Sequence, residues 1–231
     1  MIKRICMLAF VMLMAAGLTL PAGADTITTL YGTGLDNSGN LLPWGTLGDP
    51  HYKLVSVPSG SSTQIVVGQL WGSGSSWQPN IGPHNPGCST GCGPTGYYDY
   101  QTTFDLSGMN PATASITGQW TTDNYGRDIL LNGHSTGNTT GNNSFDWEWW
   151  TPFSIPKGSD FKSGLNTLDF IVYEPDANWT GLGVKITSTI ADPAPDPVPE
   201  PATLLLLCMG LAALAAWRMR SRKAQTVKYT I

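Results

Sequence analysis

Short apolar or alternating runs, separated by Gly, Pro, Asn and Ser, fill the chain between residues 25 and 189. In the run TLDFIVY at 167–173, every second residue is apolar: Leu168, Phe170 and Val172. Successive side chains of a strand point to opposite faces of its sheet. This spacing therefore predicts a strand with one buried face.

A second run, SITGQW at 115–120, places Ile116, Gly118 and Trp120 on one face, and we expect Trp120 in the core. No window of the sequence shows the 3.6-residue period of an amphipathic helix. The pattern predicts nine strands, at residues 26–31, 52–57, 64–67, 98–105, 113–121, 128–131, 150–155, 166–173 and 182–189.

The connections between these runs are rich in turn residues, since the chain has 27 Gly and 17 Pro. Many short strands with such connections predict an all-β protein, an antiparallel β-sandwich or jelly roll. About 165 residues remain between the two ends of the chain, enough for one domain with a core.

The N-terminus has the layout of a secretory signal peptide. Lys3 and Arg4 precede an apolar run at 5–20, and Ala22 and Ala24 form a small-residue A-x-A cleavage site. We expect cleavage after Ala24 and export of the chain from Asp25 onward. The alternative is an uncleaved membrane anchor.

A second apolar segment, 202–217, carries no charge and precedes a cluster of Arg and Lys at 218–223. It predicts a single C-terminal transmembrane helix, short but sufficient, with its basic tail in the cytoplasm. The alternative, a buried core helix, is disfavoured because the Pro-rich stretch 191–201 separates the segment from the domain.

The expected organisation leaves the exported part strongly acidic. Between residues 25 and 200 lie five basic and all 16 acidic residues, a net charge of −11. Such a surface excludes nucleic acid as a partner, because phosphate binding needs clustered Lys and Arg. The expected parts are a signal peptide (1–24), an exported β-sandwich (25–190), a linker with a sorting motif (191–201), a transmembrane helix (202–217) and a basic tail (218–231).

The end of the linker resembles the PEP-CTERM sorting signal of Gram-negative bacteria, a region also described as an ice-binding protein C-terminal domain. Val198, Pro199, Glu200 and Pro201 precede the apolar segment and the Arg cluster in the order typical of that signal. The tail 224–231 runs further than is usual. The resemblance implies processing by an exosortase near this motif, transient membrane anchoring, and delivery to the outer surface or extracellular matrix.

Two stretches of the domain resemble galactose-binding-like jelly rolls. DILLNG at 128–133 is a strand ending in the Asn-Gly hairpin signal, and GLNTLDF at 164–170 is the second recurring strand. The resemblance implies the fold and leaves the ligand open, although such domains often accompany glycosidases and often hold a structural calcium ion.

Tryptophans are the first candidates for ligand binding. Trp147, Trp149 and Trp150 form a cluster after a polar loop, and Trp71 and Trp77 lie in a Gly/Ser-rich stretch. Aromatic rings cover the apolar faces of sugars, so these residues predict a site for extracellular polysaccharide. The alternative is that these rings fill the core or fix loops.

Two cysteines, Cys88 and Cys92, lie in a Gly-rich loop of the exported part, and we expect a disulfide between them that stiffens this loop. The acidic and amide loop at 36–40 is a weak candidate for calcium, because it lacks the distal Glu of an EF-hand. No metal ligand is assigned and no other cofactor is expected.

The chain has no recognisable catalytic motif, and Asp146 and Glu148 alone do not define a glycosidase. We therefore expect a non-enzymatic, exported surface or matrix protein that binds extracellular polysaccharide. A structural envelope protein without a small ligand is the alternative, and a glycan-active enzyme is a third hypothesis.

Overall fold

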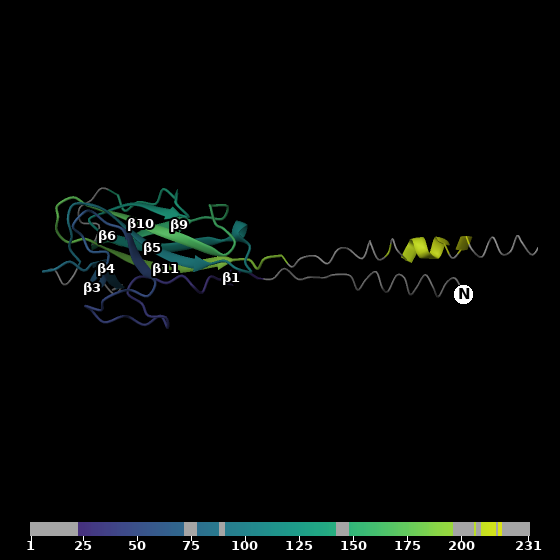
Figure 1. Cartoon of the computed structure of the whole chain (residues 1–231), viewed down its shortest axis with the longest axis horizontal. Coiled ribbons are helices and arrows are strands. Elements are labelled where there is room, and N and C mark those ends of the chain that lie inside the picture. Colours follow the sequence, from purple (N-terminus) through teal and green to yellow (C-terminus); the bar gives the residue numbers. More distant parts are fainter. Residues whose placement is uncertain are drawn as a thin grey trace, which may run out of the picture. The chain divides into compact units, whose positions relative to one another are not determined.

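The structure is a computed structural model that describes residues 23–71, 78–87, 91–141, 148–195, 206, 209–215 and 217–218. The chain divides into two compact units, Met1–Ala194 and Pro195–Ile231. The first unit is an antiparallel sandwich of two sheets (Figure 1), as the sequence predicted.

The first sheet has six strands, and β1 (Asp25–Thr26) pairs with β11 beside its main path. In spatial order the others are β3 (Ile65–Trp71), β4 (Gln78–Pro83), β11 (Gly181–Ala191), β6 (Ser115–Asp123) and β9 (Thr151–Ile155).

The second sheet has five strands. In spatial order they are β2 (Tyr52–Ser56), β5 (Gly96–Asp105), β10 (Leu165–Glu174), β7 (Tyr125–Leu131) and β8 (His134–Ser135). The long central strands β5 and β10 are in register over their full length, from Leu165 opposite Asp105 to Glu174 opposite Gly96.

Several strand boundaries differ from the prediction. The strand expected at 26–31 is reduced to β1, because the chain turns at Thr28 and Thr29 after pairing with β11. β4 and β8 were not predicted: β4 contains Pro79 and Pro83, which weaken a strand pattern, and β8 has two residues. The strand expected at 113–121 begins at Ser115, because 111–113 form the 3₁₀ turn η1 (Pro111–Thr113).

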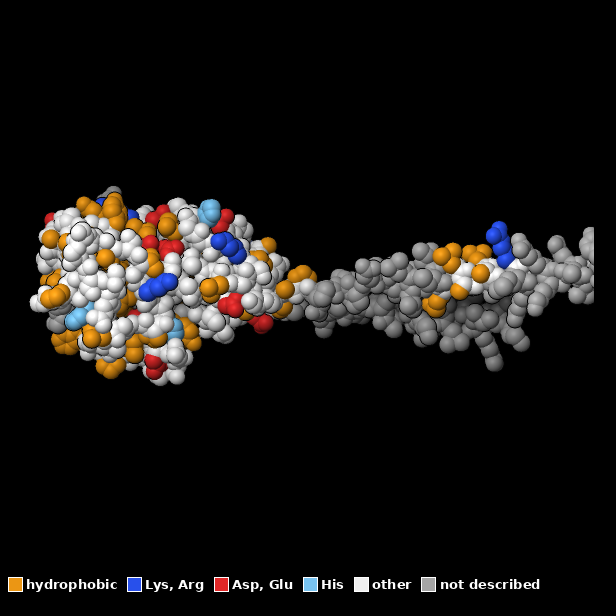
Figure 2. Space-filling view, viewed as in Figure 1, with side chains coloured by type: hydrophobic (Ala, Val, Ile, Leu, Met, Phe, Trp, Pro, Cys, Tyr) orange, Lys and Arg blue, Asp and Glu red, His pale blue; other side chains and the backbone are white. Residues whose placement is uncertain are grey.

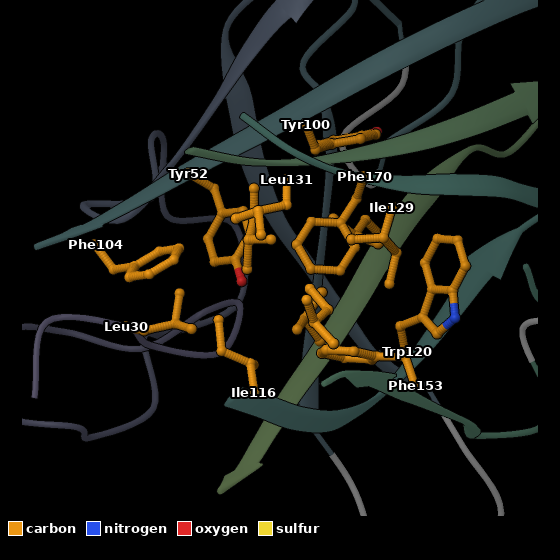
Figure 3. Close-up of a cluster of buried hydrophobic side chains, with 14 of the residues drawn as sticks. Leu30, Tyr52, Tyr100, Phe104, Ile116, Trp120, Ile129, Leu131, Phe153 and Phe170 are labelled. Atoms are coloured by element: carbon orange, nitrogen blue, oxygen red, sulfur yellow. The ribbon is translucent and has the colours of Figure 1, made fainter. Parts of the chain in front are cut away.

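The core lies between the sheets and is built from the alternating apolar positions of both. Figure 3 shows Phe170 of β10 within a cluster of side chains from both sheets. Its ring centroid lies 5.8 Å from that of Trp120 and 6.0 Å from that of Phe153, and 6.2 Å from that of Tyr52 on its own sheet. Trp120 is fully buried, which confirms its predicted place in the core.

Gly118 shows why this face of β6 needs a residue without a side chain. A Cβ atom at Gly118 would lie 2.5 Å from both the Phe153 ring and the Lys185 carbonyl oxygen. The glycine therefore leaves room for the ring of Phe153 against β6, and packing depends on its small size.

The Asn-Gly signal at 132–133 forms the expected tight turn, between β7 and β8. Both residues have positive φ, 54° at Asn132 and 83° at Gly133. These are the values that a two-residue hairpin turn requires, and Asn and Gly tolerate them best.

The folded unit extends slightly into the expected linker. β11 ends at Ala191, Pro193 forms a bridge with Met109, and the Ala194 amide donates to the Gly108 carbonyl at 2.8 Å. Residues 192–194 therefore continue the sandwich.

In the second unit, residues 206, 209–215 and 217–218 are helical. Within the described part of the chain, we find no helix with the length and apolar character needed to span a bilayer. The transmembrane helix at 202–217 and the signal peptide at 1–24 both extend over residues outside the described ranges, and they stay predictions.

Candidate functional site

Many of the residues singled out from the sequence lie outside the described ranges. They are Ala22, Trp77, Cys88, Asp146, Trp147, Val198, Pro199, Glu200 and Pro201. Ala24 is described and exposed, and of Trp71 only the backbone, in β3, is described. The geometry of the structure does not test the roles predicted for these residues.

The two remaining tryptophans of the predicted cluster differ. Trp149 is largely exposed, at 61%. Trp150 packs beside β11: the Lys185 Nζ lies 4.1 Å from the ring centroid, and a Cβ at Gly183 would lie 3.2 Å from the ring. One side of the Trp150 ring is therefore used within the fold.

The backbone around Cys92 pairs with the loop that connects β10 to β11. Cys92 forms an antiparallel bridge with Trp179. The Gly93 amide donates to Asn178 and the Thr180 amide donates to Gly91, both at 2.9 Å. Since Cys88 lies outside the described residues, the disulfide between the two cysteines stays a prediction.

In the loop at 36–40, the Asp36 carboxylate is hydrogen-bonded to residues of the same loop. Asp36 accepts hydrogen bonds of 2.8 Å from the Ser38 and Asn40 amides, and one of 3.2 Å from the Asn40 side chain. These bonds lower the pKa of Asp36 and form an Asx turn. Among the residues that the structure describes, no group of three His, Cys, Asp or Glu side chains is placed to hold a metal ion.

The structure brings together a group of side chains that the sequence analysis did not single out, on the outer face of the five-stranded sheet. Tyr98, Tyr100 and Phe104 of β5 are buried, so the residues between them point outward. β10 has the same alternation. Residues opposite each other on paired strands form rows across the face.

The first row is aromatic. Tyr97 of β5 lies opposite Tyr173 of β10, and Tyr173 lies opposite Tyr125 of β7. The ring centroids of Tyr97 and Tyr173 are 4.8 Å apart, and those of Tyr173 and Tyr125 are 6.4 Å apart with nearly parallel planes. Tyr97 is 59% exposed. Tyr173 and Tyr125 are partly buried, so the aromatic row faces the solvent mainly at Tyr97.

Arg127 of β7 packs against the aromatic row. Its guanidinium carbon lies 4.5 Å from the Tyr125 centroid and 5.3 Å from the Tyr173 centroid. Arg127 also sits at a bulge, where the pairing of β7 and β10 shifts between Ile171 and Val172. The bulge re-aims this side chain toward the rings, a common use of such irregularities.

The second row is acidic, and it lies two residues further along β5 than Tyr97, a distance of about 7 Å. Asp99 lies opposite Ile171, which lies opposite Asp128. One carboxylate oxygen of Asp99 is enclosed and has no hydrogen-bond partner. Burial, and to a smaller extent the charge of Asp169, raise the pKa of Asp99 to about 6.

The third row joins Gln101 to Asp169, which lie opposite each other. The Gln101 side-chain amide donates to Asp169 at 2.6 Å, and the Thr167 hydroxyl lies 3.4 Å from the other oxygen of Asp169. Lys53 of β2 lies opposite Gln101 on its other side. The face thus carries amide, hydroxyl and carboxylate groups beside the aromatic row, a combination suited to sugar hydroxyls.

Two acidic residues lie at the ends of their strands, close to the aromatic row: Asp123 ends β6 and Glu174 ends β10. Burial, and then the charge of Glu174, raise the pKa of Asp123 to about 7. Burial also raises the pKa of Glu174, which accepts from the Asp176 amide at 2.8 Å. The Asn124 side-chain amide, turned toward Glu174, donates to its carboxylate as well.

A signal for the outer face was present in the sequence. The alternation at 167–173 that predicted a buried side also defines an outward side, with Asp169 and Tyr173 on it, and YYDYQ at 97–101 alternates similarly. Which strands are neighbours, and in which register, is a tertiary property. The sequence therefore could not place Tyr97 against Tyr173.

The family comparison concerns the C-terminal end. The family model for the PEP-CTERM protein-sorting motif matches residues 197–223. These residues are a PEP-CTERM sorting motif. The resemblance seen in the sequence is confirmed, and the PEP-CTERM motif implies an exported protein that is sorted by an exosortase. No curated protein matches the chain.

Solved structures similar to this chain include three carbohydrate-binding modules. CBM35 from Paenibacillus barcinonensis has 14% identity and a TM-score of 0.34, and the match covers 62% of this chain and 98% of that one. A family 35 module from an environmental isolate has 13% identity and a TM-score of 0.31, with coverages of 63% and 98%. The family 11 module from Clostridium thermocellum, in complex with a beta-1,3-1,4-mixed-linked tetrasaccharide, has 14% identity and a TM-score of 0.27, with coverages of 71% and 98%.

Proposed function

We propose that this exported protein binds extracellular polysaccharide on the outer face of its five-stranded sheet. The observation that supports the proposal is the aromatic row of Tyr97, Tyr173 and Tyr125 beside a row that contains Asp99 and Asp128. Rings cover the C–H faces of a sugar, while carboxylates and amides accept and donate hydrogen bonds to its hydroxyls.

The route to the surface follows the sorting motif. We propose that the signal peptide at 1–24 directs export and that the segment 202–217 anchors the chain until an exosortase processes it near Pro199, Glu200 and Pro201. The folded unit up to Ala194 then reaches the cell surface or matrix. The protein acts there as a binding component without catalysis of its own.

Affinity electrophoresis of the full chain in gels that contain a soluble polysaccharide tests the binding proposal. The panel contains neutral glucans and mannans, a polymer of amino sugars and a polyuronate. Wild-type protein should be retarded by at least one of them. Tyr97→Ala should lose that retardation, whereas Tyr31→Ala, which removes a tyrosine from another part of the domain, should keep it. No retardation in any gel would overturn the proposal.

A second candidate, a structural envelope protein that associates with itself, is favoured by one exposed apolar group. Leu41, Trp44 and Leu47 lie within one loop and are 58%, 63% and 55% exposed. Exposed apolar groups of this kind often mark contact sites. Sedimentation of the full chain and of Trp44→Ser distinguishes the candidates, since self-association through this loop would be reduced in the variant.

A further inference from the structure

The charge of the exported part limits which polysaccharides can approach it. Its 16 acidic residues outnumber five basic ones. A field of this sign repels polyanions and attracts cations at a distance. On the side seen in Figure 2, the few charged side chains lie among uncharged groups. The attraction or repulsion of a polysaccharide at this surface therefore depends on individual charged residues.

Two neighbouring groups of the outer face favour a cation. Tyr97 and Asp99 lie on the same side of β5, about two residue rises or 7 Å apart. The Tyr97 ring is largely exposed, and Asp99 has an enclosed carboxylate oxygen that lacks a hydrogen-bond partner. An ionised carboxylate held in this way is stabilised by a positive charge placed nearby.

The aromatic row already accepts a cation at its other end. Arg127 lies over the rings of Tyr125 and Tyr173. The faces of tyrosine rings attract cations because of their quadrupole, and this attraction does not depend on whether the cation belongs to the protein or to a ligand. The ring of Tyr97, at the β5 end of the row, offers the same chemistry to a ligand.

We propose that the surface between Tyr97 and Asp99 selects polysaccharides that carry protonated amino groups over neutral and uronate polymers. The ammonium group of a hexosamine unit lies against the Tyr97 ring and pairs with Asp99. This inference rests on the polysaccharide binding proposed above and names the class of sugar.

Calorimetric titration of the full chain with three matched oligosaccharides tests the inference. They are a glucosamine oligomer, an N-acetylglucosamine oligomer of the same length and linkage, and a uronate oligomer. The glucosamine oligomer should bind about tenfold more tightly than its acetylated counterpart at low salt, and high salt should reduce this preference.

Asp99→Asn keeps the size of the side chain and removes its charge, so it should abolish the preference. Asp160→Asn, which removes an exposed charge elsewhere, should leave the preference unchanged. Circular dichroism establishes that each variant is folded, and the comparison with Asp160→Asn separates a local contact at Asp99 from the general attraction of the acidic domain for cations.

Equal or tighter binding of the acetylated or uronate oligomer would overturn the amino-sugar inference and leave polysaccharide binding intact. The same holds if the preference is insensitive to salt or to Asp99→Asn. If none of the three oligomers binds and no polysaccharide gel retards the protein, both the amino-sugar inference and the proposal of polysaccharide binding are wrong.

Discussion

The side chain of Asn132 donates a hydrogen bond of 2.8 Å to the side-chain oxygen of Asn166. The two residues belong to the two stretches that resembled galactose-binding-like domains, DILLNG and GLNTLDF. Asn166 is fully buried, and its amide nitrogen donates to the carbonyls of Lys162 and Gly164, each at 2.8 Å. The pair ties the β7–β8 turn to the start of β10.

Asn166→Asp should destabilise the domain strongly. The carboxylate would face two carbonyl oxygens in place of the two donated hydrogen bonds, at a buried position. We expect a loss of about 3 kcal/mol in the free energy of unfolding. Urea denaturation followed by tryptophan fluorescence measures it. Asn138→Asp, at a partly exposed amide, is the control, and an equal loss in both variants would contradict the prediction.

Gly118→Ala should destabilise the core, because its Cβ would meet both the Phe153 ring and the Lys185 carbonyl at 2.5 Å. We expect a cost of about 2 kcal/mol, typical of overpacking. Thermal unfolding of the variant, compared with Gly158→Ala in an exposed turn, measures the effect. Gly158 has open space around it but positive φ, so its variant isolates the backbone contribution. A smaller loss at Gly118 than at Gly158 would be evidence against the packing argument.

Stability should fall as the pH rises from 4 to 7. The pKa of Asp123 is raised by burial from 3.8 to about 7, and burial also raises the pKa of Glu174. The folded state therefore binds more protons than the unfolded state in this range, so the free energy of unfolding decreases as the pH rises. Thermal unfolding at a series of pH values tests the direction.

Asp123→Asn removes this ionisation and keeps the shape of the side chain. At pH 8 it should raise the free energy of unfolding by on the order of 2 kcal/mol, and it should flatten the pH dependence. Asp160→Asn, at an exposed position, should change neither. If Asp123→Asn is less stable than the wild type at pH 8, the acid has a stabilising role that burial does not explain.

Arg127→Met should loosen the aromatic row without unfolding the sheet. Methionine keeps the apolar stem but removes the guanidinium that lies over Tyr125 and Tyr173. A cation–π contact at a half-exposed site contributes about 1 kcal/mol. The near-ultraviolet circular dichroism of the tyrosines should change and polysaccharide affinity should fall, while the far-ultraviolet spectrum should stay the same. Lys53→Met is the charge-matched control on the same sheet.

The fold was largely predictable because its signals are local. The alternation at 115–120 and 167–173 and the Asn132-Gly133 turn depend only on neighbours in sequence. The sequence does not predict β4 because Pro79 and Pro83 obscure its strand pattern. It is a strand because it pairs with β3 on one side and β11 on the other. Pairing of this kind can overrule local propensity.

The candidate site was less predictable, because its residues meet through contacts between distant parts of the sequence. Trp149 and Trp150 are neighbours in sequence, but the ring of Trp150 packs beside Gly183 and Lys185, more than 30 residues away. The residues of the outer face are likewise distant in sequence. Their rows exist only once β5, β10 and β7 are paired in register.

Contiguous residues alone specify the all-β class, the sorting motif at 197–223 and the turn at Asn132-Gly133, so all three could be read directly from the chain. Which outward-facing side chains meet depends on strand pairing. Since register in a sheet is set by long-range packing of the buried face, folding was needed to align Tyr97, Tyr173 and Tyr125 in one row and to place Asp99 beside it.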